Sequence, residues 1–298
     1  MIERKYMSIV KLNELFKQKY KLKYRKRIIV VTSVVLALLI LLFFAFDTRL
    51  KTVIYTVDTE KLTHSVRLAL ITDLHACSYG NEQETLINAI DKQDPDVVLL
   101  GGDIFDDAIS YDNAEVLLKV ISKKYPCYYV TGNHEYWSND ISRILDIVQS
   151  YGIAVLDGAV ETLDIRGQFI NICGVDDPEA KEYTGTNYGI LEQLKKIGTA
   201  SENGYYTVLL AHRPELVNTY LKYGFDIILS GHAHGGQWRI PGLLNGLLAP
   251  NQGFLPKYAG GRYDFNSRTM IVSRGLARET TRIPRIFNRP ELVFVNLK

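Results

Sequence analysis

Apolar and polar positions divide the chain into one long apolar run and a later alternation of short strands and helices. Residues 28–46 are nineteen consecutive residues without charge, proline or glycine. As a helix rising 1.5 Å per residue, this run would span about 28 Å, close to the thickness of the bilayer hydrocarbon. A buried core helix would carry a polar face at the helical period, and this run has none. The pattern therefore predicts a transmembrane helix.

The chain after this run alternates between two patterns. Residues 47–65 are expected to form a tether and an irregular edge strand. Short runs rich in Val, Ile, Leu and Tyr predict strands covered on both faces, at residues 66–72, 97–100, 128–131, 206–211 and 225–229. Apolar positions at i, i+3, i+4 and i+7 predict helices at residues 82–92, 113–123 and 140–150. This alternation is typical of an α/β fold with largely parallel strands, and we expect residues 66–298 to form one domain.

Charge is distributed unevenly along the chain. Residues 1–27 carry a net charge of +8 and residues 257–298 a net charge of +6, so the overall +2 leaves −12 for the residues between them. Basic residues abut the start of the apolar run, whereas the charges beyond it nearly balance: Asp47, Arg49, Lys51 and Asp58. The positive-inside rule then predicts a cytoplasmic segment at residues 1–27 and an extracellular position for the domain that follows the apolar run. The long basic segment and the absence of a small-x-small site near Phe46 disfavour a cleavable signal peptide.

Composition and cysteine content exclude several classes of protein. A hydrophobic content of 47% and a charged content of 23% exclude collagen-like and disordered chains. The three cysteines form no CxxC pair, which disfavours a disulfide scaffold and a zinc knuckle. Cys127 and Cys173 lie in apolar runs and are expected in the core. Cys77 follows His75 by two residues and is expected to lie near a candidate metal ligand without being one itself. The acidic middle of the chain lacks a track of basic and aromatic residues, so no nucleic acid is expected as a partner.

Five of the six histidines follow predicted strands and lie beside Asp, Asn or Gly. The segments are Asp73-Leu74-His75, Gly102-Asp103, Gly132-Asn133-His134, Ala211-His212-Arg213 and Gly231-His232-Ala233-His234. Ligands of open α/β sheets bind at the carboxyl ends of the strands, so we expect these loops to converge. Carboxylate, amide and imidazole ligands without thiolate suit Mn, Fe, Co or Zn. The ligands are too many for one four-coordinate ion, so two divalent metal ions are expected, as in sites of phosphoester hydrolysis.

The order D-x-H, G-D, G-N-H, H and G-H-x-H resembles the calcineurin-like metallophosphoesterases over residues 66–236. The resemblance implies an αββα sandwich of two mixed sheets flanked by helices, here preceded by one transmembrane helix. The sequences around His212 and His234, and a closing S-R-G-L…R-P-E pattern from Ser273 to Glu291, are similar to a bacterial membrane-associated subgroup. That subgroup includes anchored phosphoesterases of Gram-positive bacteria and twin-arginine-exported ones.

The resemblance also implies a role for each matching residue. The first metal would be held by Asp73, His75 and His234, and Asp103 would bridge both ions. The second metal would be completed by Asn133, His212 and His232. His134 would face the substrate, where it would donate to a phosphate oxygen or protonate the leaving group. A hydroxide would then attack phosphorus in line, with His134 and the bridging Asp103 as the catalytic pair.

Several neighbouring residues allow two interpretations each. Arg213 would either contact phosphate or pair with an acidic residue of the site. Asp176 and Asp177 are typical of a turn, and Gln237 with its preceding glycines would shape the last histidine loop. Tyr136 and Trp137 would line the mouth of the site or pack at a helix start. The C-terminal arginines would form a solvated basic face or hold an anionic lipid or sugar phosphate; they include Arg274, Arg278 and Arg282.

These features together predict a membrane-anchored, dinuclear-metal-dependent phosphoesterase that hydrolyses a phosphomonoester, phosphodiester or pyrophosphate bond. Its anchor favours a lipid-linked or cell-envelope substrate. A UDP-2,3-diacylglucosamine-type pyrophosphohydrolase is an alternative, but that substrate is cytoplasmic and the predicted topology places the domain outside. A metal-dependent binding or sensor module without turnover would be expected to lack His134 or Asp103, and both are present. A purely structural envelope protein would leave the ligand clustering unexplained. The sequence leaves the oligomeric state open.

Overall fold

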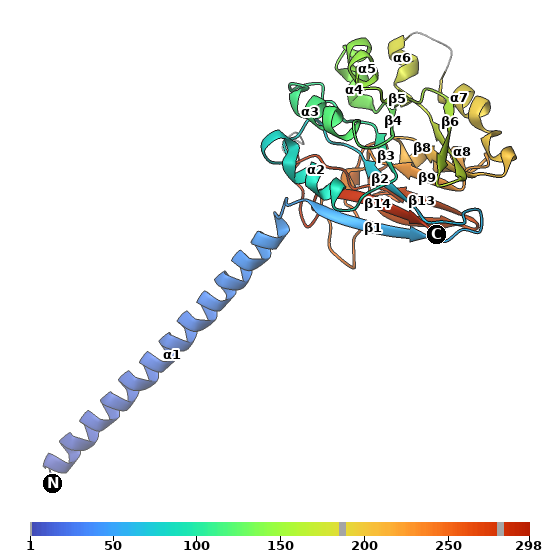
Figure 1. The fold of residues 1–298 in the computed structure, drawn as a ribbon. Helices are drawn as coiled ribbons and strands as arrows, with labels where there is room; N and C mark the ends of the chain where they lie inside the picture. The colour runs from blue at the N-terminus through green and yellow to red at the C-terminus, as the bar shows by residue number, and fades with distance from the viewer. Residues whose placement is uncertain (1, 185–188, 279–282) are drawn as a thin grey trace. The chain divides into compact units, whose positions relative to one another are not determined.

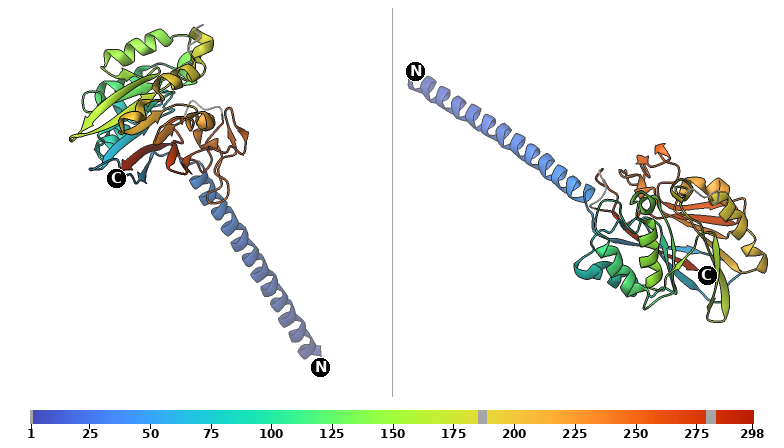
Figure 2. Two further views of the ribbon diagram at one scale, coloured as in Figure 1. Left: turned by 90° about the vertical axis from the view of Figure 1, so that its right-hand side faces the viewer. Right: turned by 90° about the horizontal axis from the view of Figure 1, so that it is seen from above.

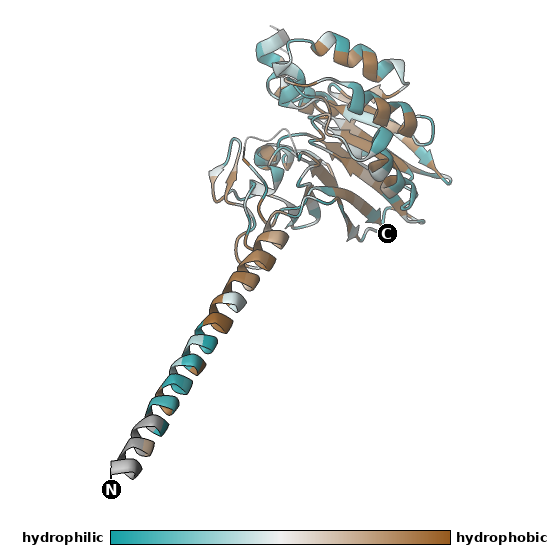
Figure 3. Ribbon diagram, turned by 90° about the vertical axis from the view of Figure 1, so that its left-hand side faces the viewer, coloured by the Kyte–Doolittle hydropathy of each residue, from teal (hydrophilic) through white to brown (hydrophobic). Residues whose placement is uncertain are grey.

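The computed structural model describes residues 2–184, 189–278 and 283–298, which form two compact units, Met1–Phe46 and Asp47–Lys298. The first unit is one helix, α1 (Ile2–Ala45), which runs without a break through the basic segment and the apolar run. Figure 3 shows its second half in brown, the colour of hydrophobic residues, after a largely teal stretch. Among the described residues, this helix is the one that is long and apolar enough to cross a membrane.

The second unit contains two six-stranded mixed sheets and a short hairpin (Figure 1). The first sheet has the order β1 (Lys51–Val57), β14 (Glu291–Leu297), β2 (Val66–Ile71), β3 (Val97–Gly101), β4 (Cys127–Val130), β5 (Ala154–Val155). Its strands β2 to β5 are parallel, with Leu68 opposite Val97. Strand β14 runs antiparallel to β2 and parallel to β1. The first and last strands of the domain are therefore neighbours.

The second sheet also has four parallel strands, and each of its two edge strands is antiparallel to its neighbour. Its order is β12 (Gly261–Phe265), β13 (Arg268–Val272), β9 (Ile227–Ser230), β8 (Tyr206–Leu210), β7 (Gln168–Gly174), β6 (Ala159–Ile165). The four central strands are parallel, whereas β12 and β6 run antiparallel to their neighbours. The separate hairpin pairs β10 (Leu248–Ala249) with β11 (Gly253–Phe254). The carboxyl ends of β8 and β9 therefore lie at one edge of this sheet.

The sheets face each other, and helices cover their outer faces (Figure 2). Val, Leu and Ile side chains of both sheets form one buried cluster between them, with Leu68, Leu99, Val208 and Leu229 among its members. Two further clusters lie on the outer faces, beneath α2 (Glu84–Asp91), α3 (Asp112–Ile121), α5 (Ile141–Ser150), α7 (Ile190–Ile197) and α8 (Val217–Tyr220). Continuous apolar strands give this layering because both faces of each central strand are buried. The predicted αββα sandwich is confirmed.

The predicted strands and helices agree with the structure to within about two residues at either end, a typical uncertainty of helix and strand boundaries. The sequence predictions do not include four helices: α4 (Asn133–Trp137), α6 (Ala180–Thr184), α7 (Ile190–Ile197) and α8 (Val217–Tyr220). Of these, α4, α6 and α8 are too short to show a period. The predictions also do not include strands β5 to β7 and β10 to β14. The expected irregular edge strand is instead regular, since all seven residues of β1 pair with β14. Cys127 and Cys173 are buried in β4 and β7, as expected of small core residues.

Candidate metal centre

The loops that follow β2, β3, β4, β8 and β9 converge at one edge of the sandwich. They bring together the side chains that the sequence singled out: Asp73, His75, Asp103, Asn133, His134, His212, His232 and His234. All of these are buried except His134, which is partly exposed. The convergence follows from the parallel strands, whose carboxyl ends share an edge.

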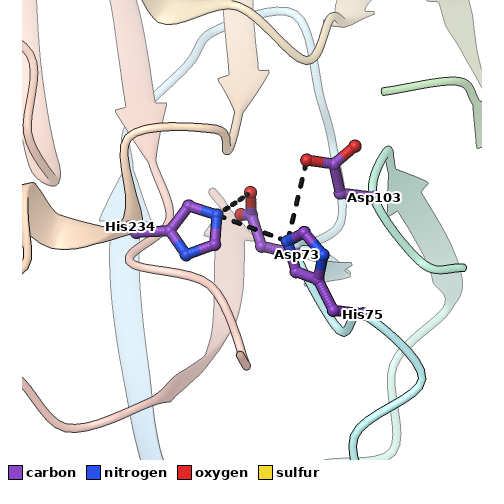
Figure 4. A group of neighbouring side chains, drawn as sticks. All are labelled: Asp73, His75, Asp103 and His234. Carbon is purple, nitrogen blue, oxygen red and sulfur yellow. Dashed lines mark hydrogen bonds and ion pairs between the residues drawn. The ribbon is translucent and has the colours of Figure 1, made fainter. Parts of the chain in front are cut away.

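A first cluster consists of Asp73, His75, Asp103 and His234, with one ligand atom of each lying within 4.8 Å of the others (Figure 4). The Nε2 atoms of His75 and His234 are 3.3 Å apart. His234 Nε2 lies 3.4 Å from a carboxylate oxygen of Asp73, and His75 Nε2 lies 3.7 Å from one of Asp103. Facing lone pairs of this kind need a cation or a proton between them. The cluster therefore has the donor set of a cation site.

A second cluster contains Asp103, His212 and His232, so Asp103 belongs to both. His212 Nε2 lies 3.1 Å from Asp103 Oδ2 and 3.2 Å from His232 Nδ1. Asn133 is buried, and its Oδ1 has no hydrogen-bond partner among the described residues. An unpartnered buried amide oxygen is costly unless something binds it. A divalent ion would satisfy this oxygen and the carboxylate that the clusters share.

Burial and neighbouring charges separate the pKa values of these groups. Burial lowers the pKa of His232 and of His234 well below the usual range, and the nearby His212 and His75 add to this effect. Burial would raise the pKa of Asp103, but the charge of His212 and its hydrogen bond hold that pKa well below the usual range. Asp103 raises the pKa of His212 to about 10 against the effect of burial. Neutral imidazoles beside an ionised carboxylate suit a metal cation.

The backbone of the site is held in the sparsely populated left-handed region. Positive φ angles occur at Asp73 (51°), His75 (48°), Asp103 (52°), His232 (64°) and His234 (46°). Such conformations cost of order 1–3 kcal/mol each and persist where the surrounding structure enforces them. The strand-end turns therefore hold these side chains in directions that an ordinary extended or helical backbone would not provide.

Two glycines make room for the ligands. Gly102 has a φ of +88°, and a Cβ there would lie 2.6 Å from His212 Nδ1. A Cβ at Gly132 would collide with the carboxylate of Asp103. The G-D and G-N-H motifs thus require glycine because His212 and Asp103 lie too close to Gly102 and Gly132 to leave room for a Cβ.

Three acidic residues that the sequence did not single out hold the ligands in place. His75 Nδ1 lies 3.0 Å from Asp106 Oδ2, and His134 Nδ1 lies 2.5 Å from Asp107 Oδ1. The Glu135 carboxylate accepts four backbone N–H bonds from the loops after β3 and β4, at 2.7–3.2 Å. Asp106 and Asp107 could have been recognised because they follow Asp103 in the same strand-end loop. Glu135 could have been recognised as the residue directly after a histidine of the site.

Arg213 is buried and already engaged by other side chains. Its Nε and Nη2 donate to the two carboxylate oxygens of Asp177, at 2.5 and 2.8 Å, and its Nη1 donates to Asn251 Oδ1 at 2.6 Å. The same Asn251 oxygen lies 2.8 Å from His232 Nε2. Asp177 therefore does more than form a turn, while Asp176 accepts a bond from Thr131. Asn251 lies in the turn between β10 and β11, and no motif of the sequence singles it out. Contact of Arg213 with phosphate stays a prediction.

The remaining neighbours of the site differ in exposure. Cys77 is buried and lies near the Arg278 backbone, 3.4 Å from its nitrogen. Tyr136 is buried, whereas Trp137 is 41% exposed with its ring 4.9 Å from that of His134. Trp137 is thus the more peripheral of the two aromatic residues.

Two of the described C-terminal arginines, Arg274 and Arg285, are buried and do not belong to a solvated face. Arg274 is buried and donates to Asn245 and Gly260, so the expectation is wrong for this residue. Arg285 is also buried and donates to the carbonyl oxygen of Arg274. Arg278 lies over the Tyr79 ring, 4.5 Å from its centre. Arg282 lies outside the described residues. The buried arginines fix the last loop before β14.

Two facing mixed sheets thus carry, at the ends of their strands, buried carboxylates and imidazoles in two clusters that share one aspartate. This is the arrangement of a metal-dependent hydrolase. Residues 66–236 match the calcineurin-like phosphoesterases, and the chain belongs to this family. It is a phosphoesterase, a hydrolase that acts on phosphate esters, and members of the family bind a dinuclear metal site.

Similar proteins occur in bacteria and animals. An uncharacterized metallophosphoesterase of Campylobacter jejuni is 30% identical over 286 residues, which are 91% of this chain and 70% of the relative. A transmembrane protein with a metallophosphoesterase domain from Danio rerio is 29% identical over 83% of this chain and 57% of its own length. The NAD nucleotidase of Haemophilus influenzae has a similar fold, with a TM-score of 0.50 and 17% identity over 72% of this chain and 45% of its own.

Proposed function

We propose that this protein is a membrane-anchored phosphoesterase that depends on two divalent metal ions. The observation that carries the proposal is that two clusters share Asp103, whose carboxylate has two oxygens to divide between two ions. Asp73, His75 and His234 would hold the first ion. The second would be held by Asn133, His212 and His232. Mn, Fe, Zn or Co all suit these oxygen and nitrogen donors.

Two bound ions would supply Lewis acidity and lower the pKa of water at the site. The protein's own residues would then position the substrate and move protons. Asp107 occupies Nδ1 of His134, so Nε2 is the nitrogen that would donate to a phosphate oxygen or protonate the leaving group. Arg213 has five N–H donors, and besides Asp177 and Asn251 its guanidinium lies 3.5 Å from Glu179 and 3.8 Å from Glu215. Contact of Arg213 with a phosphate oxygen would require one of these ion pairs to open.

We further propose the membrane arrangement that the charge pattern predicts. Residues 1–27 would be a cytoplasmic basic segment, 28–46 the anchor, 47–65 a tether with an edge strand, and 66–298 the extracellular phosphoesterase domain. The protein would belong to the bacterial membrane-associated subgroup. Its substrate would be a lipid-linked or cell-envelope phosphomonoester, phosphodiester or pyrophosphate. Protease treatment of intact cells tests the topology, because protection of the domain would contradict it.

The reaction is tested with the full chain in detergent, stripped with a chelator and reloaded with Mn. We expect hydrolysis of p-nitrophenyl phosphate or bis-p-nitrophenyl phosphate. Asp103→Asn should lose bound metal and activity together, whereas His134→Ala should keep metal and lose rate. Loss of metal in His134→Ala would contradict its role. Full metal loading without turnover on monoesters, diesters and pyrophosphates would instead indicate a binding or sensor module.

A further inference from the structure

An exposed apolar surface is formed by the segment that follows the last histidine loop and by Ile283, which lines the same pocket. Its members are Trp238, Ile240, Leu243, Phe254, Leu255 and Ile283, and we call them the apolar loop surface. Leu243 is 82% exposed, Phe254 76% and Leu255 67%. Single exposed apolar residues are ordinary, but a group of large ones on one segment marks an interaction surface. The segment is drawn in orange in Figure 1.

A pocket of about 230 Å³ opens within this surface. It is lined by Gly236, Gln237, Trp238, Leu247, Leu248, Phe254 and Ile283. The part of the lining that is exposed to the pocket is almost wholly apolar, because the Oε1 atom of Gln237, the one polar side chain of the lining, is buried. Hydrocarbon is the chemistry that fits it.

The surrounding sequence has the composition of a membrane interface. Residues 237–257 contain no acidic residue, and Arg239 and Lys257 are the two charged ones. Segments that lie in the bilayer interface combine Trp, Phe and Leu with basic residues in this way. The indole nitrogen of Trp238 donates to the carbonyl oxygen of Pro284 at 3.0 Å. The ring can therefore enter an apolar medium without an unsatisfied donor.

Contacts within the domain place this surface near the point where the domain begins. The Arg239 backbone nitrogen donates to the Ile286 carbonyl at 3.0 Å. Three residues further on, Arg289 donates to the carbonyl oxygens of Arg49 and Leu50, at 2.9 and 3.0 Å. Three residues of extended chain span about 10 Å. The end of the apolar loop surface at Trp238 and Ile240 is thus linked to Leu50 through this short stretch of chain and the Arg289 side chain. The predicted membrane span ends four residues before Leu50.

We infer that the apolar loop surface inserts into the bilayer interface on the side of the membrane where the domain lies. The inference rests on the proposed anchor, because residues 47–50 leave the domain little room to move away from the bilayer. The same loop reaches the metal centre, since Asn251 bonds to both His232 and Arg213. Membrane contact would therefore hold the site at the level of lipid headgroups, where a phosphate ester of a lipid is presented.

The two tryptophans of the chain, Trp137 and Trp238, provide the test. The full-length Trp137→Phe variant, in which Trp238 is the single tryptophan, is reconstituted into phosphatidylcholine vesicles with and without brominated acyl chains. We expect bromine to quench the emission of Trp238 by about twofold, because interfacial residues reach the acyl boundary. The matched Trp238→Phe variant reports Trp137 beside the metal centre, and its quenching should be much weaker.

The outcomes separate this inference from the proposals on which it rests. Quenching needs no turnover, so it is independent of the proposed hydrolysis. If the protein floats with the vesicles but Trp238 is quenched no more than Trp137, the inference is wrong. If it does not float, the anchor and the inference are both wrong. Shielding of Trp238 from aqueous iodide that grows with protein density, without bromine quenching, would indicate a second copy of the chain and also overturn the inference.

A second variant tests which side chains make the membrane contact. Leu243→Asp combined with Phe254→Asp places two charges on the apolar loop surface without altering any proposed ligand. Hydrolysis of soluble p-nitrophenyl phosphate should be unchanged, while quenching of Trp238 by brominated lipid should fall to the level of Trp137. Retained quenching in this variant would contradict the role of these side chains.

Discussion

The metal centre depends at the scale of single residues on carboxylates that touch the proposed ligands. Asp106 and Asp107 are adjacent in sequence, yet each hydrogen-bonds a different histidine, His75 and His134 respectively. Asp106 Oδ2 also lies 3.9 Å from His134 Nδ1, a longer contact than that of Asp107. Both bonds are made to Nδ1, which leaves Nε2 to point into the site. A carboxylate behind a ligating histidine fixes the ring and raises its basicity.

These hydrogen bonds to different histidines give a first prediction. Asp106→Asn should weaken metal binding by about 10–100-fold, because the amide holds His75 less firmly and makes it less basic. Asp107→Asn is the matched control, since it changes the neighbour of His134 alone and should lower the rate while metal affinity is retained. Competition for Mn²⁺ against a chelating dye measures both. Equal affinities in the two variants would contradict the assignment.

A second prediction concerns Glu135, whose carboxylate accepts backbone N–H groups from two loops. In Glu135→Gln the amide nitrogen would face two of these donors and leave them unsatisfied. At about 1–3 kcal/mol for each buried donor, the free energy of unfolding should fall by about 2–6 kcal/mol. Glu182→Gln on exposed α6 should change it by less than about 0.5 kcal/mol. Denaturant unfolding of both variants measures the difference, and similar midpoints would refute the role of Glu135.

Sequence reasoning reaches some residues of the site and not others. The convergence of Asp73, Asp103 and Asn133 could be predicted because each follows an apolar strand and parallel strands share an edge. Asn251 could not be predicted, because it lies in the turn between β10 and β11 and no local pattern encodes the position of that hairpin beside His232. The ion pair of Arg213 with Asp177 could not be predicted either, because the two residues are distant in sequence.

At the scale of elements, the loop after β9 combines close packing with backbone strain. Gly236 has a φ of +66°, and a Cβ there would collide with the backbone of Gly246. Gly242 has a φ of +79°, but a Cβ there would meet open space. The two glycines therefore share their backbone conformation and differ in their surroundings.

This pair gives a third prediction. Gly242→Ala should lower the free energy of unfolding by about 1–2 kcal/mol, the cost of a left-handed residue with a Cβ. Gly236→Ala should lower it by about 1–3 kcal/mol more, because two backbone segments must also separate. It should weaken metal binding too, since His234 lies two residues away. Unfolding midpoints and Mn²⁺ titration check both effects, and equal stabilities would show that the loop tolerates the displacement.

The elements themselves differ in how well the sequence predicts them. Strands such as β2, β3 and β8 are continuous apolar runs because both of their faces are buried, and such runs are recognisable. The pairing of β1 with β14 joins the two ends of the domain, and no local pattern encodes it. The regular geometry of β1 follows from its pairing with β14. Because this pairing is not visible in the local sequence of β1, the local sequence predicts an irregular strand.

At the scale of the whole molecule, the acidic middle of the chain is partly explained by the metal centre. Residues 28–256 carry a net charge of −12, and Asp73 and Asp103 are buried together within them. Burial raises the pKa of Asp73, and the charge of Asp103 adds to this effect. Two adjacent buried carboxylates repel each other, so the folded domain would gain stability from cations placed between them.

The last prediction follows from this repulsion. Metal that binds the folded state alone stabilises it by about 2.7 kcal/mol at 100 times its Kd, which corresponds to about 5–10 °C in Tm for a domain of this size. Mn²⁺ added to the chelator-treated full chain in detergent should therefore raise Tm by that amount. The shift should shrink as pH falls, because protons compete for the imidazole and carboxylate ligands. Asp103→Asn is the control and should show little shift, since it removes a ligand of both clusters. Thermal unfolding with and without chelator measures this, and an unchanged Tm across millimolar Mn²⁺ and Zn²⁺ would mean that the shared aspartate does not hold metal.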